Sequence, residues 1–153
     1  MQLKTVNFGE IEINEEDVII FPEGIPGFED SKKYVLIGNE SNEAVFFWLQ
    51  SVDIPELCFI VTDPFMIYDG YGADVEDDDI ELLGITDPNR VLTLTIVVIP
   101  ENINEIRVNL KAPIIINMEK KLGKQIIQKN DDLPIRYYLS KEKPLSGYWQ
   151  TAN

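Results

Sequence analysis

An acidic run at residues 74–81 holds the densest group of side chains that could do chemistry. Six of its eight positions are Asp or Glu. Clustered carboxylates can bind Ca²⁺, but this run lacks the alternating oxygen ligands and the central glycine of a calcium loop. Two interpretations therefore stay ahead of calcium: a solvated loop that meets a basic partner, and a surface that only confers solubility. The candidate contact residues are Asp74, Glu76, Asp77, Asp78 and Asp79.

The sequence contains no histidine, and this excludes several kinds of catalytic site. Serine and cysteine triads, histidine-based proton transfer and the commonest zinc sites all depend on that residue. The glycines lie singly, without the spacing of a phosphate-binding loop. Two facing carboxylates could still serve a hydrolase, although 27 acidic residues make some such pair inevitable. We expect no enzymatic activity, no cofactor and no metal.

Charge is distributed unevenly along the chain. Residues 1–105 carry 4 basic and 23 acidic side chains, a net charge of −19, whereas residues 106–153 carry 9 basic and 4 acidic ones, a net charge of +5. Nucleic-acid binding needs clustered lysine and arginine, so we expect no direct contact with nucleic acid. The acidic body favours a basic partner, with plain solubility as the alternative.

The segment FPEGIPGFED, residues 21–30, is the second candidate site. Its two prolines and two glycines exclude regular secondary structure, yet it is too apolar for an ordinary surface turn. It is either a loop packed over a barrel mouth or a rigid apolar contact for a partner. The candidate contact residues are Phe21, Pro22, Ile25, Pro26 and Phe28.

The stretch from Ile106 to Gln128 predicts how the chain is organised. Alternating residues 106–111 indicate a strand, Pro113 marks the start of the next one, and 114–116 are three β-branched isoleucines typical of a strand buried on both faces. Residues 117–123 predict a turn, and 124–128 a returning strand with Ile126 and Ile127 as its apolar residues.

Similar patterns elsewhere predict further short strands with little helix between them. Asp69-Gly70 favours a small hairpin at 68–71, and Asp78 with Glu81 resembles a capping box for a helix of about one turn that Gly84 ends. The expected fold is all-β: a single compact antiparallel β-barrel-like domain with about ten short strands and minimal helix. The other expected strands are residues 4–8, 11–13, 18–21, 34–37, 45–50, 57–62, 90–100 and 134–139.

Length and apolar patterning predict one domain at residues 1–139 and a flexible tail at 140–153. No run reaches the 18 to 20 apolar residues of a membrane helix, and the first residues lack the pattern of a secretory signal. Cys58, the single cysteine, lies in an apolar segment and is expected in the core. We expect a cytoplasmic protein without membrane contact that is a monomer on its own.

Several segments together resemble the flagellar assembly factor FliW family. They are FPEGIPGFED at 21–30, WLQS at 48–51, Phe59 with Asp63-Pro64, LTIVVIP at 94–100, VNLKAPIIIN at 108–117 and GKQIIQ at 123–128. Their order and spacing cover the chain to about Leu139. The resemblance carries over a structural signature of mostly apolar, glycine, proline and amide positions: Gly24, Gly27, Gln50, Pro64, Asn109, Pro113, Asn117 and Gln125.

The resemblance implies a small β-barrel-like fold and a non-enzymatic regulator that exchanges protein partners. Members of the family bind flagellin in the cytoplasm. When released, they bind the RNA-binding repressor CsrA and relieve its repression of flagellin translation. Two rival hypotheses stay open: a small-molecule-binding β-barrel, for example one that holds a sugar through Trp48 and the tyrosines, and a carboxylate-based hydrolase.

Overall fold

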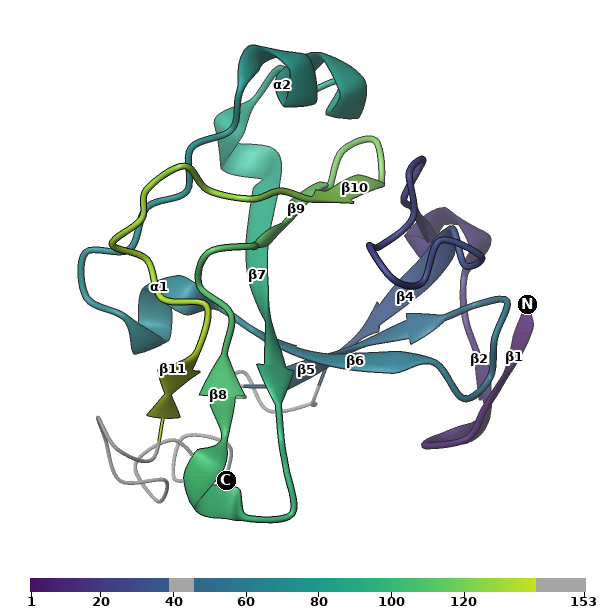
Figure 1. Ribbon diagram of the computed structural model, residues 1–153. Coiled ribbons are helices and arrows are strands. Elements are labelled where there is room, and N and C mark those ends of the chain that lie inside the picture. The colour runs from purple at the N-terminus through teal and green to yellow at the C-terminus, as the bar shows by residue number, and fades with distance from the viewer. Residues whose placement is uncertain (39–45, 140–153) are drawn as a thin grey trace.

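The structure is a computed structural model that describes residues 1–38 and 46–139. Strands dominate it, and its helices are short (Figure 1). The strands are β1 (Gln2–Thr5), β2 (Gly9–Glu12), β3 (Ile19–Ile20), β4 (Lys33–Ile37), β5 (Phe46–Ser51), β6 (Cys58–Thr62), β7 (Val91–Val98), β8 (Arg107–Val108), β9 (Ile114–Asn117), β10 (Leu122–Gln125) and β11 (Tyr137–Tyr138). The helical elements are η1 (Glu15–Asp17), α1 (Pro64–Ile67), α2 (Asp77–Leu83), η2 (Pro88–Arg90) and η3 (Ile103–Glu105).

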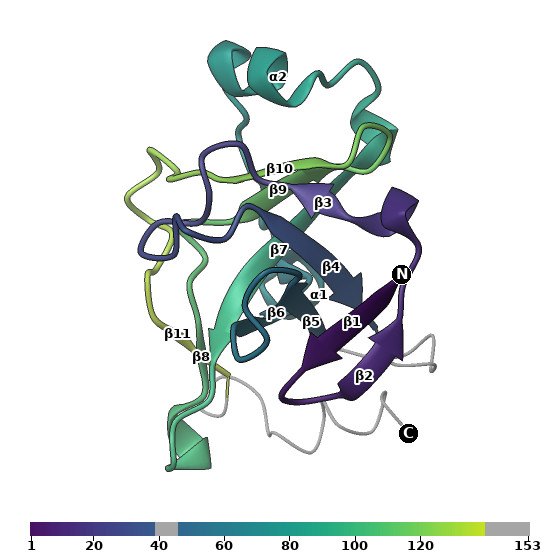
Figure 2. The same ribbon diagram turned by 90° about the vertical axis from the view of Figure 1, so that its right-hand side faces the viewer.

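Seven of these strands close into a barrel in the order β7-β6-β5-β4-β3-β10-β9, and β9 pairs back with β7. Strand β8 pairs with the C-terminal end of β7, and β11 pairs with β8, so these two strands extend the sheet outside the barrel. The β1–β2 hairpin forms a separate sheet beside the barrel (Figure 2). The predicted all-β barrel is confirmed. One pair is not antiparallel, because β3 runs parallel to β10 through the single rung Leu122–Ile20.

The three isoleucines of β9 show why this strand is apolar on both faces. Ile114 and Ile116 join the buried cluster inside the barrel, whereas Ile115 points outward into a second cluster with Leu83 and Ile126. All three isoleucines are fully buried. The outer face of β9 therefore needs a cover, and the segment that contains α2 supplies it.

Gly123 allows the barrel to close tightly at the β3–β10 seam. A Cβ atom placed on Gly123 would lie 2.7 Å from Cζ of Phe21, closer than real side chains approach. The Phe21 ring is fully buried and makes an edge contact with Tyr34, with ring centroids 5.2 Å apart. The seam thus depends on an aromatic ring packed directly against bare backbone.

The predicted hairpin at residues 68–71 is wrong. Asp63 caps α1 by accepting a hydrogen bond from the Phe65 N–H, and Pro64 begins the helix, so the chain reaches Asp69-Gly70 from a helical turn. The predicted capping box is also wrong, because the N-cap of α2 is Glu76 and its side chain makes no capping bond. The predicted helix stop at Gly84 is confirmed, with φ of 64°, although α2 has seven residues.

Two apolar residues are less buried than their neighbours, and for Cys58 this differs from the prediction of a core position. Ile127 is 78% exposed, whereas Ile126 is buried, because successive residues of an extended chain face opposite sides. Cys58 is only partly buried, and burial raises the pKa of its thiol. The predicted tail at 140–153 lies outside the described residues.

Candidate functional site

The acidic segment, residues 74–84, includes α2 and ends at the left-handed Gly84. Asp77, Asp78 and Asp79 occupy the first turn of the helix, where negative charge interacts favourably with the exposed N–H groups of the helix start. At the other end the Gly84 N–H donates to the carbonyls of Glu81 and Ile80. Local sequence therefore explains why the acidic run becomes a short helix.

One apolar contact and one buried amide hold the end of the acidic segment on the barrel. Leu83 is fully buried against Ile115 and Ile126. The side-chain amide of Asn117, which is 2% exposed, donates to the carbonyls of Leu83 at 2.8 Å and Gly84 at 3.2 Å. A buried amide that fills its bonding capacity in this way fixes the geometry of both partners.

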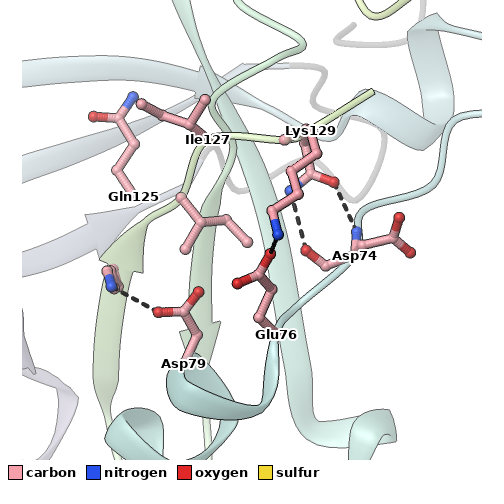
Figure 3. A pocket seen from close by; sticks show the side chains of 9 residues that line it. Asp74, Glu76, Asp79, Gln125, Ile127 and Lys129 are labelled. Carbon is pink, nitrogen blue, oxygen red and sulfur yellow. Dashed lines mark hydrogen bonds and ion pairs between the residues drawn. The ribbon is translucent and has the colours of Figure 1, made fainter. Parts of the chain in front are cut away.

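A second buried amide holds the start of the acidic segment. Gln128 is 3% exposed. Its Oε1 accepts the Asp74 N–H at 2.8 Å and its Nε2 donates to the Asp74 carbonyl at 3.2 Å. Figure 3 shows this reciprocal pair of bonds across one side of a cleft. The Gln128 side chain thus makes with the Asp74 backbone the two hydrogen bonds that a neighbouring strand would otherwise make.

Two lysines form ion pairs with carboxylates of the acidic segment, and Figure 3 labels one of these pairs, Lys129 with Glu76. Lys124 Nζ lies 2.6 Å from Asp79 and 3.6 Å from Glu23, and the Asp79 hydrogen bond raises the pKa of Lys124. Lys129 Nζ lies 2.7 Å from Glu76. The Asp79 side chain is only 15% exposed and that of Glu76 is 56% exposed, so the first pair holds the segment more firmly.

The cleft between these elements has a volume of about 460 Å³. It is lined by the acidic segment on one side and by residues that continue β10 on the other: Asp74, Glu76, Asp79, Lys124, Gln125, Ile126, Ile127, Gln128 and Lys129. Of the five predicted acidic contacts, Glu76 and Asp79 are in internal ion pairs, and Asp74, Asp77 and Asp78 have exposed side chains. The arrangement can present negative charge on a fixed frame.

The FPEGIPGFED segment and Ser31 lie between β3 and β4 and form a loop, the 21–31 loop, which is split between the core and the surface. Phe21 and Ile25 are buried at 0% and 1% exposure, whereas Phe28 is 45% exposed and makes an edge contact with Phe59. Pro22 and Pro26 are exposed. Of the five predicted contact residues, only Pro22, Pro26 and Phe28 can reach a partner without unpacking the barrel.

The loop's own backbone explains its glycines. Gly24 and Gly27 have φ values of 71° and 89°, in the region that side chains with a Cβ avoid. A Cβ on Gly24 would also lie 2.8 Å from the Cα of Glu29. The Gly27 N–H donates to the Glu29 carboxylate at 2.8 Å, and this bond lowers the pKa of Glu29.

The other signature residues bond to the backbone or begin an element. Asn109 Oδ1 accepts the N–H groups of Lys111 and Ala112, and Gln125 Nε2 donates to the Ala112 carbonyl. The Nε2 atom of buried Gln50 lies within hydrogen-bonding distance of three carbonyls, one at the end of β5 and two in the turn that follows it. Pro64 is the first residue of α1, and Pro113 directly precedes β9.

The barrel interior bears on the rival hypotheses. It is packed with side chains from the surrounding strands and the 21–31 loop, and the Trp48 ring makes an edge contact with Phe8 at 5.7 Å. Among residues 1–38 and 46–139, no three His, Cys, Asp or Glu side chains converge to hold a metal ion. Within the same ranges, none of the helices has the length and apolar character needed to cross a membrane.

The carboxyl groups with shifted pKa values are also informative. The pKa values of Glu12, Glu29 and Asp131 are all lowered, and their largest causes are hydrogen bonds from the N-terminal amine, the Gly27 N–H and Lys111 respectively. A general acid needs the opposite shift. These exposed groups therefore lack the property that a carboxylate hydrolase requires of its proton donor.

Comparison with known proteins gives one consistent family. A family model described as FliW protein matches residues 2–139. The flagellar assembly factor FliW of Caldanaerobacter subterraneus subsp. tengcongensis is 46% identical over 142 residues, which cover 93% of this chain and 95% of that protein. The one of Ruminiclostridium cellulolyticum is 42% identical over 142 residues, covering 93% and 96%. A crystal structure of the flagellar assembly factor FliW superposes with a TM-score of 0.83 at 37% identity, covering 91% of this chain and 96% of that one.

Proposed function

The chain belongs to the FliW family of flagellar assembly factors, and from this premise we propose that it acts by exchanging two protein partners in the cytoplasm. One partner is flagellin. The other is the RNA-binding repressor CsrA, which the chain binds when flagellin releases it. Binding of CsrA then relieves repression of flagellin translation, and the chain itself catalyses no reaction.

The observation that carries this proposal is the fixed acidic segment. Buried amides of Gln128 and Asn117 attach its two ends to the barrel, and Asp77 and Asp78 lie exposed at the start of α2. An RNA-binding protein is basic where it holds phosphate, so this surface attracts such a protein. The same charges repel RNA within about 8 to 10 Å, the screening length at moderate salt. A complex there can lower RNA affinity without covering the RNA site.

A different surface supports flagellin binding. The exposed part of the 21–31 loop, made by Pro22, Pro26 and Phe28, is apolar, and its Phe28 ring makes an edge contact with Phe59. Flexible terminal segments of an unassembled subunit need an apolar surface to fold against. A strand edge is the other kind of surface that such a segment could pair with, but in the LTIVVIP strand β7 pairs with β6 on one side and with β9 and β8 on the other. The paired positions of β7 are therefore not available to a flagellin segment.

Charge reversal tests the assignment of the acidic segment. The double variant Asp77→Lys with Asp78→Lys leaves Glu76 and Asp79 in their ion pairs, so the segment stays in place. We expect CsrA affinity to fall about tenfold or more and to lose most of its salt dependence, with flagellin affinity unchanged. Calorimetric titration of each partner, at two salt concentrations, measures both.

The matched control is Glu10→Lys with Glu16→Lys, which reverses two exposed acids in β2 and η1. It changes the net charge by the same amount and should leave CsrA affinity within about twofold. Equal loss in both double variants would reduce the effect to net charge alone. Absence of binding to both partners at micromolar concentration would refute the proposed function.

A further inference from the structure

The chain from Gln125 to Gln128 continues the line of β10 with backbone bonds on one side only. The Ile126 N–H donates to the Pro113 carbonyl at 2.9 Å, and the Gln128 N–H donates to the Lys111 carbonyl at 2.7 Å. These two bonds extend the β9–β10 pairing past Gln125. In an extended chain, the N–H and C=O of the residue between them point to the opposite side.

That opposite side is open at Ile127. Among the residues that the structure describes, neither the N–H nor the C=O of Ile127 has a hydrogen-bond partner. Strand β3 pairs with this side of β10 only at Leu122, and the Phe21 ring covers Gly123, so the open part of the edge begins beyond Gly123. The 78% exposure of Ile127 places its backbone and side chain within reach of another molecule. An unpaired strand edge is a template for a further strand.

The open edge borders the cleft of about 460 Å³ whose other wall is the acidic segment. Lys124 and Lys129 are already bonded to Asp79 and Glu76. The exposed carboxylate of Asp74 lines the cleft, and Glu76, Asp77 and Asp78 line an adjoining hollow. The charges left without a partner at this edge are thus negative. These carboxylates attract a positively charged segment to the edge and repel a negatively charged one.

We propose that the Gln125–Gln128 edge receives an extended segment of a basic partner protein, which adds to the sheet as a further strand. Main-chain bonds to Ile127 supply binding that does not depend on the partner's sequence, and lysine or arginine side chains of the added strand face the acidic segment. This inference rests on the proposed function only in taking a basic protein as the partner. It specifies how that partner is held.

Amide hydrogen exchange tests the pairing directly. The probe is the acetylated and amidated hexapeptide Lys-Thr-Lys-Val-Lys-Thr. NMR measures the amide exchange rates of the intact chain with and without this peptide. We expect the Ile127 amide to exchange rapidly in the free chain and at least about tenfold more slowly when the peptide is bound. The Ile126 and Gln128 amides, already bonded, change little. A peptide with glutamate in place of each lysine should give no protection.

Two substitutions at one position separate backbone from side chain. Ile127→Pro removes the N–H, which makes no bond within the described fold, whereas Ile127→Ala keeps it and removes most of the side chain. Strand addition predicts about tenfold weaker peptide binding for Ile127→Pro and a smaller loss for Ile127→Ala. Equal losses, or peptide binding without protection of the Ile127 amide, would overturn the proposal. The exchange measurement on the unmodified chain decides the matter if Ile127→Pro fails to fold.

The same exchange experiment with CsrA separates this inference from the proposed function. If CsrA binds and the Ile127 amide stays unprotected, strand addition is wrong and the partner assignment stands. If the peptide protects Ile127 and CsrA does not bind, strand addition stands and the partner assignment is wrong.

Discussion

The 21–31 loop and the acidic segment are both surface segments, yet they are attached to the barrel in opposite ways. The loop places Phe21 and Ile25 inside the barrel core. The acidic segment has Leu83 as its fully buried apolar anchor, with partly buried Val75 packed against the same cluster, and it is held further by hydrogen bonds and ion pairs. Because of this difference, some changes act on the whole fold and others act locally. Changes in the loop's buried residues should unfold the barrel, whereas changes in the polar contacts should release one segment.

The largest expected effect is at Phe21. Phe21→Ala removes a fully buried ring at the barrel seam and should lower the free energy of unfolding by about 3 to 5 kcal/mol. Phe28→Ala in the same loop removes a half-exposed ring and should cost about 1 kcal/mol or less. Urea unfolding followed by fluorescence measures both. Similar losses would mean that the two halves of the loop do not differ in attachment.

Tyr71 provides a pH-dependent test at the entry to the acidic segment. Its hydroxyl donates to the Leu110 carbonyl at 2.9 Å, and burial raises its pKa to about 12. Because the pKa of an unfolded tyrosine is about 10, the stabilisation is complete below pH 10. It is lost at about 1.4 kcal/mol per pH unit as the pH rises toward 12.

Urea unfolding at a series of alkaline pH values measures this loss. Tyr71→Phe should flatten the decline between pH 10 and pH 12. A decline that stays equally steep in Tyr71→Phe would assign the alkaline transition to other groups. Tyr34 and Lys124 are the candidates, since the pKa of each is raised and acts in the same direction.

Gly123→Ala tests how tightly the seam is closed. The added Cβ meets the Phe21 ring at 2.7 Å, and overpacking of this kind should cost about 1 to 3 kcal/mol. Gly72→Ala, just before the acidic segment, is the matched control because no atom lies within 4 Å of its Cβ position. It should change stability by no more than about 0.5 kcal/mol. Equal effects would show that the ring moves aside freely.

The smallest expected effect separates the two ion pairs of the cleft. Lys124→Gln breaks a partly buried pair and should cost about 1 kcal/mol at low salt, less at high salt. Lys129→Gln breaks an exposed pair and should leave global stability unchanged. Thermal unfolding at two salt concentrations compares them. A salt-independent loss in Lys124→Gln would indicate that its alkyl chain, and not its charge, holds the segment.

The strands were largely predictable because their signal is local. The three isoleucines at 114–116 predicted a strand buried on both faces, and all three are buried. Gly84 predicted the end of α2 for the same reason, since left-handed backbone favours glycine. The wrong hairpin at 68–71 came from weighing Asp69-Gly70 above the stronger signal before it. Asp63 followed by Pro64 is a helix start that the sequence displayed.

The cleft was less predictable because its two walls lie about fifty residues apart in the sequence. The acidic run was visible, but nothing local indicated that Lys124 or Lys129 would meet it, or that Gln128 would bond to Asp74. Ile127 could have been flagged. Two consecutive residues of a strand face opposite sides. In a strand at 124–128, Ile126 and Ile127 therefore cannot both face the same buried side.

The single parallel rung between Ile20 and Leu122 also has a consequence for synthesis. The two strands of this rung are separated by roughly a hundred residues. Strand β7 also pairs with a strand that is synthesised after it, β9. A ribosome has therefore made most of the chain before the ring of strands can be completed. During that interval β3 and β7 each lack a neighbour. A molecule that binds the unpaired edges of β3 and β7 until the last third of the chain has been made would protect the nascent chain from aggregation.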